Sequence, residues 1–287
     1  MLLTVSHTPR YAFADPVAHG LQRLRLRPKT THGQEVLDWR MDLSGARLEA
    51  EYDDQHHNHT ALVSIEPGTT EVTVTCTGTV RTMDNNGITG AHAGHTPLWC
   101  FLRQTPLTRA DHRVRALLAS VDADRSDMLG FLHALSAAVA ARVEYAPGTT
   151  DVGTTAEQAL AAGQGVCQDH AHVFISAGRL LDIPMRYVGG YLRMNDRVEQ
   201  EAGHGWAEAH VQGLGWVGFD VSNAICPDER YIRVASGCDY AEAAPVTGVA
   251  TGAGETRLDV HLSVDENLLG QQQQQSAGGG QQQMQGG

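Results

Sequence analysis

The chain has 287 residues, of which 41% are hydrophobic and 19% charged, a balance typical of globular proteins that bury a core. Its formal net charge of −12 argues against nucleic acid or a membrane surface as partner, because both attract basic patches. No apolar run approaches the roughly 20 residues that span a bilayer. The N-terminus also lacks a basic start followed by a long apolar segment, so we expect no signal peptide and a cytoplasmic location.

The five cysteines are an odd number at irregular spacing. They therefore predict neither a disulfide framework nor a paired zinc signature. In the cytoplasm they are expected to be reduced, which leaves each thiol free to react. They are Cys76, Cys100, Cys167, Cys226 and Cys238.

Residues 1–105 are expected to form an N-terminal β domain. Short alternating or β-rich stretches are separated by Gly, Pro, Asn and Asp, which favour turns. Within residues 21–27, three arginines alternate with leucines, so one face of that strand is wet and the other buried. Several short strands in succession predict a sandwich. The expected strands lie at 2–5, 21–27, 36–41, 61–65 and 72–80.

From residue 106 to 269 the pattern predicts an α+β core. A helix begins near Ser126, carries apolar residues at helical spacing, and ends before Pro147. Thr154 with Glu157 fits a capping box for a short helix that leads to the next glycine-rich segment. Strands are expected at 185–193, 204–211, 215–221, 231–235 and 257–264. The Gln- and Gly-rich residues 270–287 cannot bury a core and are expected to be disordered.

One cysteine lies at a chemically special position. Gly163 and Gly165 deliver Cys167 to the first turn of a helix, where unpaired backbone N–H groups and the helix dipole stabilise a thiolate. This pattern alone leaves a structural role open, because a free cysteine often packs as a small buried hydrophobe.

Two predicted strands carry partners for this cysteine. A three-residue loop over 212–214 places Trp206 opposite Asp220 and His204 diagonal to it, at the roughly 7–8 Å typical of diagonal neighbours. A one-residue register shift would destroy this arrangement. If the helix start approaches the same face, Cys167, His204 and Asp220 supply a nucleophile, a base and a group that orients the base.

Several motifs resemble the transglutaminase-like superfamily, specifically its bacterial branch. They are residues 165–169 (Gly-Val-Cys-Gln-Asp), 204–208 (His-Gly-Trp-Ala-Glu), 215–220 (Gly-Trp-Val-Gly-Phe-Asp) and, in the N-terminal part, 24–28 (Leu-Arg-Leu-Arg-Pro). The resemblance implies a β-sandwich-like N-terminal domain joined to a papain-like core, an α+β fold in which the cysteine helix packs on an antiparallel sheet. It also implies a catalytic triad of Cys167, His204 and Asp220.

The chain departs from the family pattern at a few positions. His170 stands where an aromatic apolar residue is common, Gly205 where alanine is, and Cys238 where arginine is. None of these changes removes a member of the triad.

The chemistry expected of this triad is thiol catalysis on amide bonds of proteins or peptides, through a thioester acyl-enzyme. Water as acceptor gives a protease or amidase, which we favour, and an amine gives a transglutaminase. The alternative from another class is a catalytically silent binding or scaffold protein on the same fold. Acyl transfer from a coenzyme-bound thioester is less consistent with this acidic chain, which shows no basic cluster for phosphates.

Further residues are expected around the cleft. Trp206, Gln168 and His170 are assigned to it, although for His170 a solvent-facing position on the helix is the favoured alternative. Residues 55–59 contain three histidines, but no ligand partners stand at fixed spacing nearby, so we expect no metal and no cofactor.

Overall fold

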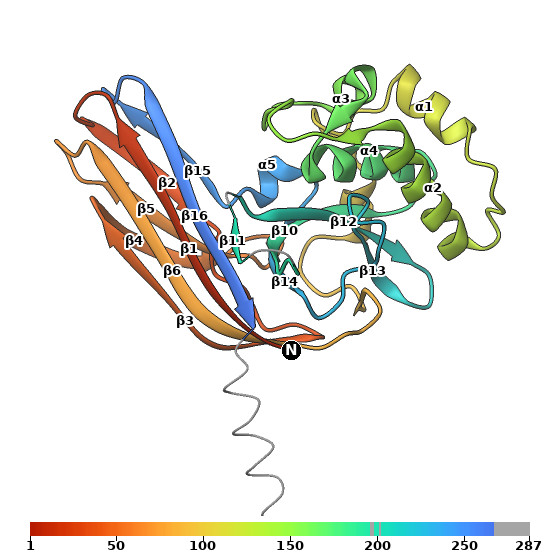
Figure 1. Ribbon diagram of the computed structural model, residues 1–287, viewed down its shortest axis with the longest axis horizontal. Coiled ribbons are helices and arrows are strands. Elements are labelled where there is room, and N and C mark those ends of the chain that lie inside the picture. The colour runs from red at the N-terminus through yellow and green to blue at the C-terminus, as the bar shows by residue number, and fades with distance from the viewer. Residues whose placement is uncertain (196–197, 201, 267–287) are drawn as a thin grey trace, which may run out of the picture.

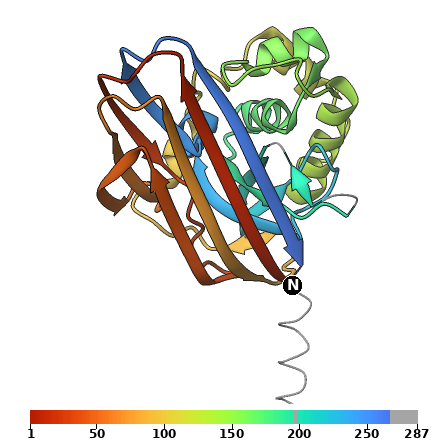
Figure 2. The same ribbon diagram turned by 60° about the vertical axis from the view of Figure 1, so that its left-hand side comes forward.

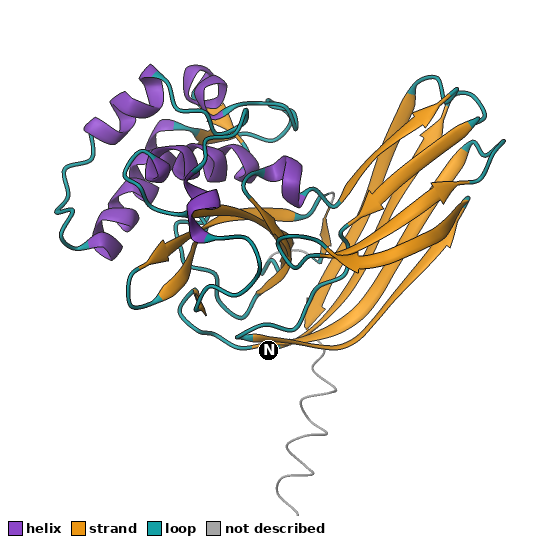
Figure 3. Ribbon diagram, turned by 180° about the vertical axis from the view of Figure 1, so that it is seen from behind, coloured by secondary structure: helices purple, strands orange, loops and turns teal. Residues whose placement is uncertain are grey.

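The computed structural model describes residues 1–195, 198–200 and 202–266. The chain folds as a β-sandwich beside an α+β unit that contains the helices (Figure 1). Figure 3 shows the same division by secondary structure, with the helices gathered on one side of the molecule. None of the described helices is both long and apolar enough to cross a bilayer. The predicted tail at 270–287 lies outside the described residues.

The sandwich consists of two antiparallel sheets with the strand orders β11-β16-β1-β6-β3 and β15-β2-β5-β4. Residues on alternate positions of β5 and β6, such as Val63, Val72 and Val74, are buried between the sheets. The strand bounds are β1 (Leu2–Phe13), β2 (His19–Leu24), β3 (Gln34–Ser44), β4 (Ala46–Asp53), β5 (His59–Ile65), β6 (Glu71–Thr82), β11 (Glu199–Gln200), β15 (Val246–Thr251) and β16 (Thr256–Glu266).

The end of the chain corrects the predicted division at residues 105 and 269. β16 runs antiparallel to β1 from the pair Leu3↔Glu266 to the pair Phe13↔Thr256, and β15 pairs with β2, so both strands belong to the sandwich. In the opposite direction β7 (Ile88–Gly90) leaves the expected N-terminal domain and pairs with a strand of the core. The returning strands cover the edges of β1 and β2, which would otherwise present unpaired backbone groups.

The core is built on a third antiparallel sheet, with the order β14-β10-β12-β13-β7. Its remaining strands are β10 (Met185–Leu192), β12 (His204–Val211), β13 (Gly215–Phe219) and β14 (Tyr231–Gly237), and β8 (Glu144–Tyr145) pairs with β9 (Gln164–Gly165) apart from it. The helices are η1 (Leu98–Leu102), α1 (His112–Ala119), α2 (Met128–Arg142), α3 (Ala156–Ala162), α4 (Cys167–Arg179) and α5 (Tyr240–Ala243).

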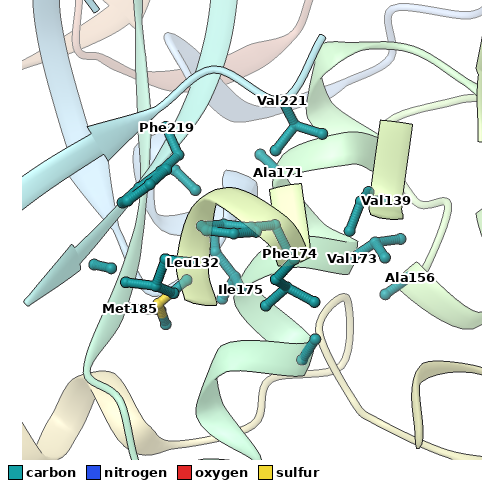
Figure 4. Close-up of a cluster of buried hydrophobic side chains, with 14 of the residues drawn as sticks. Leu132, Val139, Ala156, Ala171, Val173, Phe174, Ile175, Met185, Phe219 and Val221 are labelled. Atoms are coloured by element: carbon teal, nitrogen blue, oxygen red, sulfur yellow. The ribbon is translucent and has the colours of Figure 1, made fainter. Parts of the chain in front are cut away.

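Helix α4 lies at the centre of the core, between the sheet and helices α1, α2 and α3 (Figure 2). Every residue of α4 after Cys167 is buried. Phe174 packs against Phe219 of β13 with ring centroids 5.2 Å apart, and Leu132 of α2 lies on the same cluster (Figure 4). Contact on all sides fixes the position of this helix, and therefore that of Cys167 at its start.

The predicted capping box of Thr154 and Glu157 is not the one that forms, and Glu157 caps another helix instead. α3 begins one residue later, with a box made by Thr155 and Gln158. Glu157 is then free to cap a different helix: its carboxylate accepts hydrogen bonds from the backbone N–H groups of Asp111 and Val114 at 2.8 and 2.9 Å. These bonds satisfy backbone N–H groups at the start of α1, which have no acceptor within the helix.

The sandwich and the core share a hydrophobic cluster. Ile232 and Val234 of β14 pack with Leu3 and Val5 of β1 and with Leu262 of β16, and all five side chains are buried. The returning strand β16 therefore helps to hold the core sheet in place.

Replacing Leu262 tests this shared cluster. Leu262→Ala should lower the free energy of unfolding by about 2–5 kcal/mol, because it removes a fully buried side chain and leaves a cavity. The matched change Leu258→Ala in the same strand, where the residue is 50% exposed, should cost no more than about 0.5 kcal/mol. Urea denaturation measures both, and equal costs would contradict the shared core.

Candidate active site

The pairing of β12 with β13 has the register that the sequence predicts. Ala207 lies opposite Phe219 and Glu208 opposite Gly218, which brings Trp206 level with Asp220 at the strand end. His204 Nε2 then lies 2.6 Å from Asp220 Oδ2. Both side chains are buried, so this hydrogen bond is shielded from competing water.

Two residues that the sequence reading missed fix the carboxylate of Asp220. Tyr231 Oη and Asn223 Nδ2 both donate to its Oδ2, at 2.6 and 2.7 Å, and Asn223 N donates to its Oδ1 at 3.2 Å. Burial raises the pKa of Asp220, but these bonds and His204 lower it below its ordinary value, so the carboxylate is ionised. Asn223 follows Asp220 by three residues, which is a recognisable turn signal; Tyr231 offered none.

The start of α4 is held by Asp169, three residues into the helix from its cap at Val166. Asp169 Oδ2 accepts hydrogen bonds from Val166 N at 2.8 Å and from Thr150 Oγ1 at 2.7 Å. These contacts tie the first turn to the preceding loop. They place the half-buried Cys167 beside His204, close enough that Cys167 raises the pKa of the imidazole.

His204 is therefore held between two partners. Its Nε2 is bonded to Asp220, which leaves Nδ1 for Cys167. Burial lowers the pKa of His204, but the hydrogen bonds with Asp220 and Cys167, and their negative charges, raise it to about 10. At neutral pH the ring is consequently an imidazolium, the form that stabilises a neighbouring thiolate.

Trp206, predicted as a cleft residue, supports the histidine. Its ring stacks on that of His204 with centroids 6.3 Å apart and an interplanar angle of 25°, and it meets Tyr231 edge-on at 5.5 Å. Trp206 is only 3% exposed and also packs with Val188 and Leu192. It restricts the rotation of His204 and keeps both nitrogens aligned with their partners.

The other two predicted cleft residues are buried in structural contacts. Gln168 Nε2 donates to the carbonyl of Val152 at 3.2 Å. His170 Nε2 donates to the carbonyl of Val143, and its Nδ1 lies 2.8 Å from Ser222 Oγ. His170 is 2% exposed, so the solvent-facing alternative is wrong. Its Nε2 ties α4 to the end of α2, and its Nδ1 ties α4 to the segment that follows Asp220.

Tyr187 of β10 is a further residue that the sequence reading missed. Its ring is clamped between His172 and Tyr240, at centroid distances of 5.5 and 5.9 Å, and it is 3% exposed. Its hydroxyl makes no hydrogen bond with the described residues. A Cβ added at Gly205 would collide with this hydroxyl, which explains the glycine next to His204. Burial and the charge of Cys167 raise the pKa of Tyr187, so the hydroxyl stays a donor.

Comparison with known families agrees with this architecture. Residues 3–81 match the bacterial transglutaminase-like N-terminal region, and residues 115–221 match the transglutaminase-like superfamily. The chain thus contains a transglutaminase-like core and a bacterial transglutaminase-like N-terminal domain. The matched core runs from α1 to the end of β13 and contains Cys167, His204 and Asp220.

Relatives of this transglutaminase-like chain occur in mycobacteria. An uncharacterized protein of Mycobacterium leprae is 29% identical over 274 residues, which cover 91% of this chain and 98% of that protein. An uncharacterized protein of Mycobacterium tuberculosis is 35% identical over 131 residues, 42% of each chain. Among solved structures, a "Putative Cysteine Protease" from Cytophaga hutchinsonii matches with a TM-score of 0.73 and 21% identity, covering 92% of this chain and 90% of that one. It shows that the two share a fold.

The charge state of His204 can be measured directly. Because its pKa is raised from 6.5 to about 10, the stability that its protonated form contributes is complete below pH 6.5 and lost as the pH rises to about 10. Asp220→Asn should lower the pKa of His204 and reduce the free energy of unfolding at pH 7 by about 1.5–3 kcal/mol, as for a hydrogen bond between charged groups.

Titration of the His204 ring by NMR, in the wild-type protein and in Asp220→Asn, tests this. Exposed histidines elsewhere in the chain, such as His112, serve as internal references. A wild-type His204 that titrates with the exposed histidines would contradict the geometry.

Proposed function

We propose that this protein is a cysteine-dependent hydrolase that cleaves amide bonds of proteins or peptides through a thioester acyl-enzyme. The proposal assigns Cys167 as nucleophile, His204 as general acid and base, and Asp220 as the group that orients His204. The observation that carries it is the position of His204, hydrogen-bonded through one ring nitrogen to Asp220 and in contact with Cys167 at the helix start. Without this geometry, a family likeness in sequence would support the fold but not the catalytic function.

In the first half of the reaction, the Cys167 thiolate attacks the carbonyl carbon of the amide. The carbonyl π electrons move to its oxygen and give a tetrahedral oxyanion. His204, as imidazolium, then donates its proton to the amide nitrogen, the C–N bond breaks, and the amine leaves. Cys167 is left as a thioester and His204 as neutral imidazole.

In the second half, His204 removes a proton from water, and the resulting hydroxide attacks the thioester carbonyl. The C–S bond breaks, the carboxylic acid product leaves, and the thiolate and imidazolium are restored. An amine in place of water would give a new amide, as in cross-linking. We favour water, the acceptor expected from the resemblance to bacterial members of the superfamily.

Two donors are assigned to the oxyanion. The backbone N–H of Cys167 lies in the first turn of α4, where helix geometry leaves it without an intrahelical acceptor. The Tyr187 hydroxyl, unpartnered among the described residues and packed against Gly205 beside His204, is the second. Donors fixed in advance cost no reorganisation when the negative charge develops.

Replacing the nucleophile tests the proposal. The wild-type protein should hydrolyse amides and be labelled fast by iodoacetamide at neutral pH, and Cys167→Ser should abolish both. The matched control Cys226→Ser removes another half-buried cysteine, whose pKa is raised by burial, and should leave activity and labelling intact.

A peptide library, digested with and without an added primary amine, supplies the substrate and separates hydrolysis from amine transfer. Equal labelling of wild type and Cys167→Ser, with no cleavage in either, would contradict the proposal and favour a binding protein on the same fold.

The role of Tyr187 gives a separate expectation. Tyr187→Phe keeps the packed ring and removes only the hydroxyl, so kcat should fall about 100-fold, the loss typical of one oxyanion donor, with KM little changed. Iodoacetamide labelling of Cys167 should be unaffected, because alkylation forms no oxyanion. A kcat within about threefold of wild type would exclude this donor.

A further inference from the structure

A second cluster of reactive side chains lies where the sandwich meets the core, outside the proposed catalytic residues. His56 comes from the loop between β4 and β5 of the sandwich, Cys238 directly follows β14, and Glu242 lies in α5. One potential ligand atom from each residue lies within 4.8 Å of the other two. The histidines at 55–59 are recognisable in the sequence. Their partners Cys238 and Glu242 lie far away in the chain, so the sequence pattern does not reveal them.

His56 is held in place and has an unused nitrogen. Its side chain is only 3% exposed, and its Nε2 lies 2.8 Å from Glu242 Oε2. Its Nδ1 is buried without a hydrogen-bond partner among the described residues. Its backbone N–H is fixed by Asp54 Oδ1 at 2.9 Å, and its ring packs against Phe101. Buried polar atoms without a partner are rare in native proteins and call for an explanation.

The Cys238 thiol makes a long hydrogen bond through its Sγ, so the sulfur is available as a metal ligand. Its thiol is buried, and its Sγ lies 3.8 Å from the carbonyl oxygen of Cys100, a long contact.

Glu242 supplies the negative charge and the opening to solvent. It is 28% exposed, and its Oε2 accepts the backbone N–H of Cys238 at 2.8 Å. Burial raises the pKa of Glu242, but His56 and Cys238 lower it to about 2, so it is ionised at neutral pH. Arg103 donates to Oε1 at 3.0 Å, yet its side chain is 65% exposed and is free to swing away as a cation enters.

We propose that His56, Cys238 and Glu242 form a site for a divalent transition-metal cation of the Zn²⁺ class, with water as the fourth ligand. Nitrogen, thiolate and carboxylate donors are the set that Zn²⁺ selects over Mg²⁺ or Ca²⁺. Tetrahedral Zn²⁺ ligands lie roughly 3.3–3.8 Å apart, so His56 and Glu242 separate slightly and Cys238 moves closer as the metal enters.

Charge and protons balance in this step. The metal displaces the proton of the Cys238 thiol, which is released to solvent, and the thiolate and the Glu242 carboxylate together neutralise the two positive charges. Affinity therefore increases with pH. Because His56 belongs to the sandwich and the other two ligands belong to the core, the bound cation ties the two units together and stabilises the folded chain.

The test uses the full chain after treatment with a chelator. Titration with Co²⁺ should produce a thiolate-to-cobalt charge-transfer band that saturates at one equivalent, and Zn²⁺ should displace the cobalt and raise the Tm. Cys238→Ser should remove the band and weaken Zn²⁺ binding at least 10-fold, measured against a chromophoric competitor. Cys226→Ser and His59→Ala, which change a half-buried cysteine and a neighbouring histidine outside the cluster, should bind as wild type does.

A second variant keeps the result independent of folding. His56→Gln retains the bulk and polarity of the side chain, and circular dichroism of each metal-free variant checks that it is folded. Absence of Co²⁺ and Zn²⁺ binding by the wild-type chain at micromolar concentration would overturn the proposal, as would a charge-transfer band that persists in Cys238→Ser. The readouts are spectra and binding, so they are independent of amidase activity.

Discussion

The hydrogen bond between His204 and Asp220 is the contact on which the site depends. It exists because β12 and β13 pair in one register, which brings the two residues to the same end of the sheet. Tyr231 and Asn223 fix the carboxylate from outside this hairpin, and Trp206 fixes the imidazole. A shift of the register by one residue would turn one of the two side chains to the other face and break their hydrogen bond.

The other half of the site depends on how α4 is buried. Its packing against the sheet on one side and against α1, α2 and α3 on the other leaves the helix no freedom to slide. Asp169 fixes the first turn, and His170 ties it to Ser222 near Asp220. The proposed nucleophile and the proposed base thus sit on rigid elements, as the short contacts of acyl transfer require.

Features that depend on residues close together in the chain could be predicted from the sequence. The β12–β13 register followed from a three-residue loop, and the helix-start position of Cys167 from the glycines before it. Prediction failed where distant segments meet. The return of β16 to β1, the reach of Tyr231 to Asp220, and the meeting of His56 with Cys238 depend on pairings between remote parts of the chain. Alternating hydrophobicity predicts a half-buried strand but does not indicate which strand pairs with it.

The central claim is that His204 activates Cys167 for attack on a carbonyl. It is tested most directly by mixing the protein with an activated ester of a short peptide, quenching in acid, and locating the acyl group by intact mass and peptide mapping. The account predicts one acyl group, on Cys167, in the wild-type protein, and at least a 100-fold slower acylation in His204→Ala. Acylation of Cys167 at the same rate in both proteins, or at another residue, would contradict it.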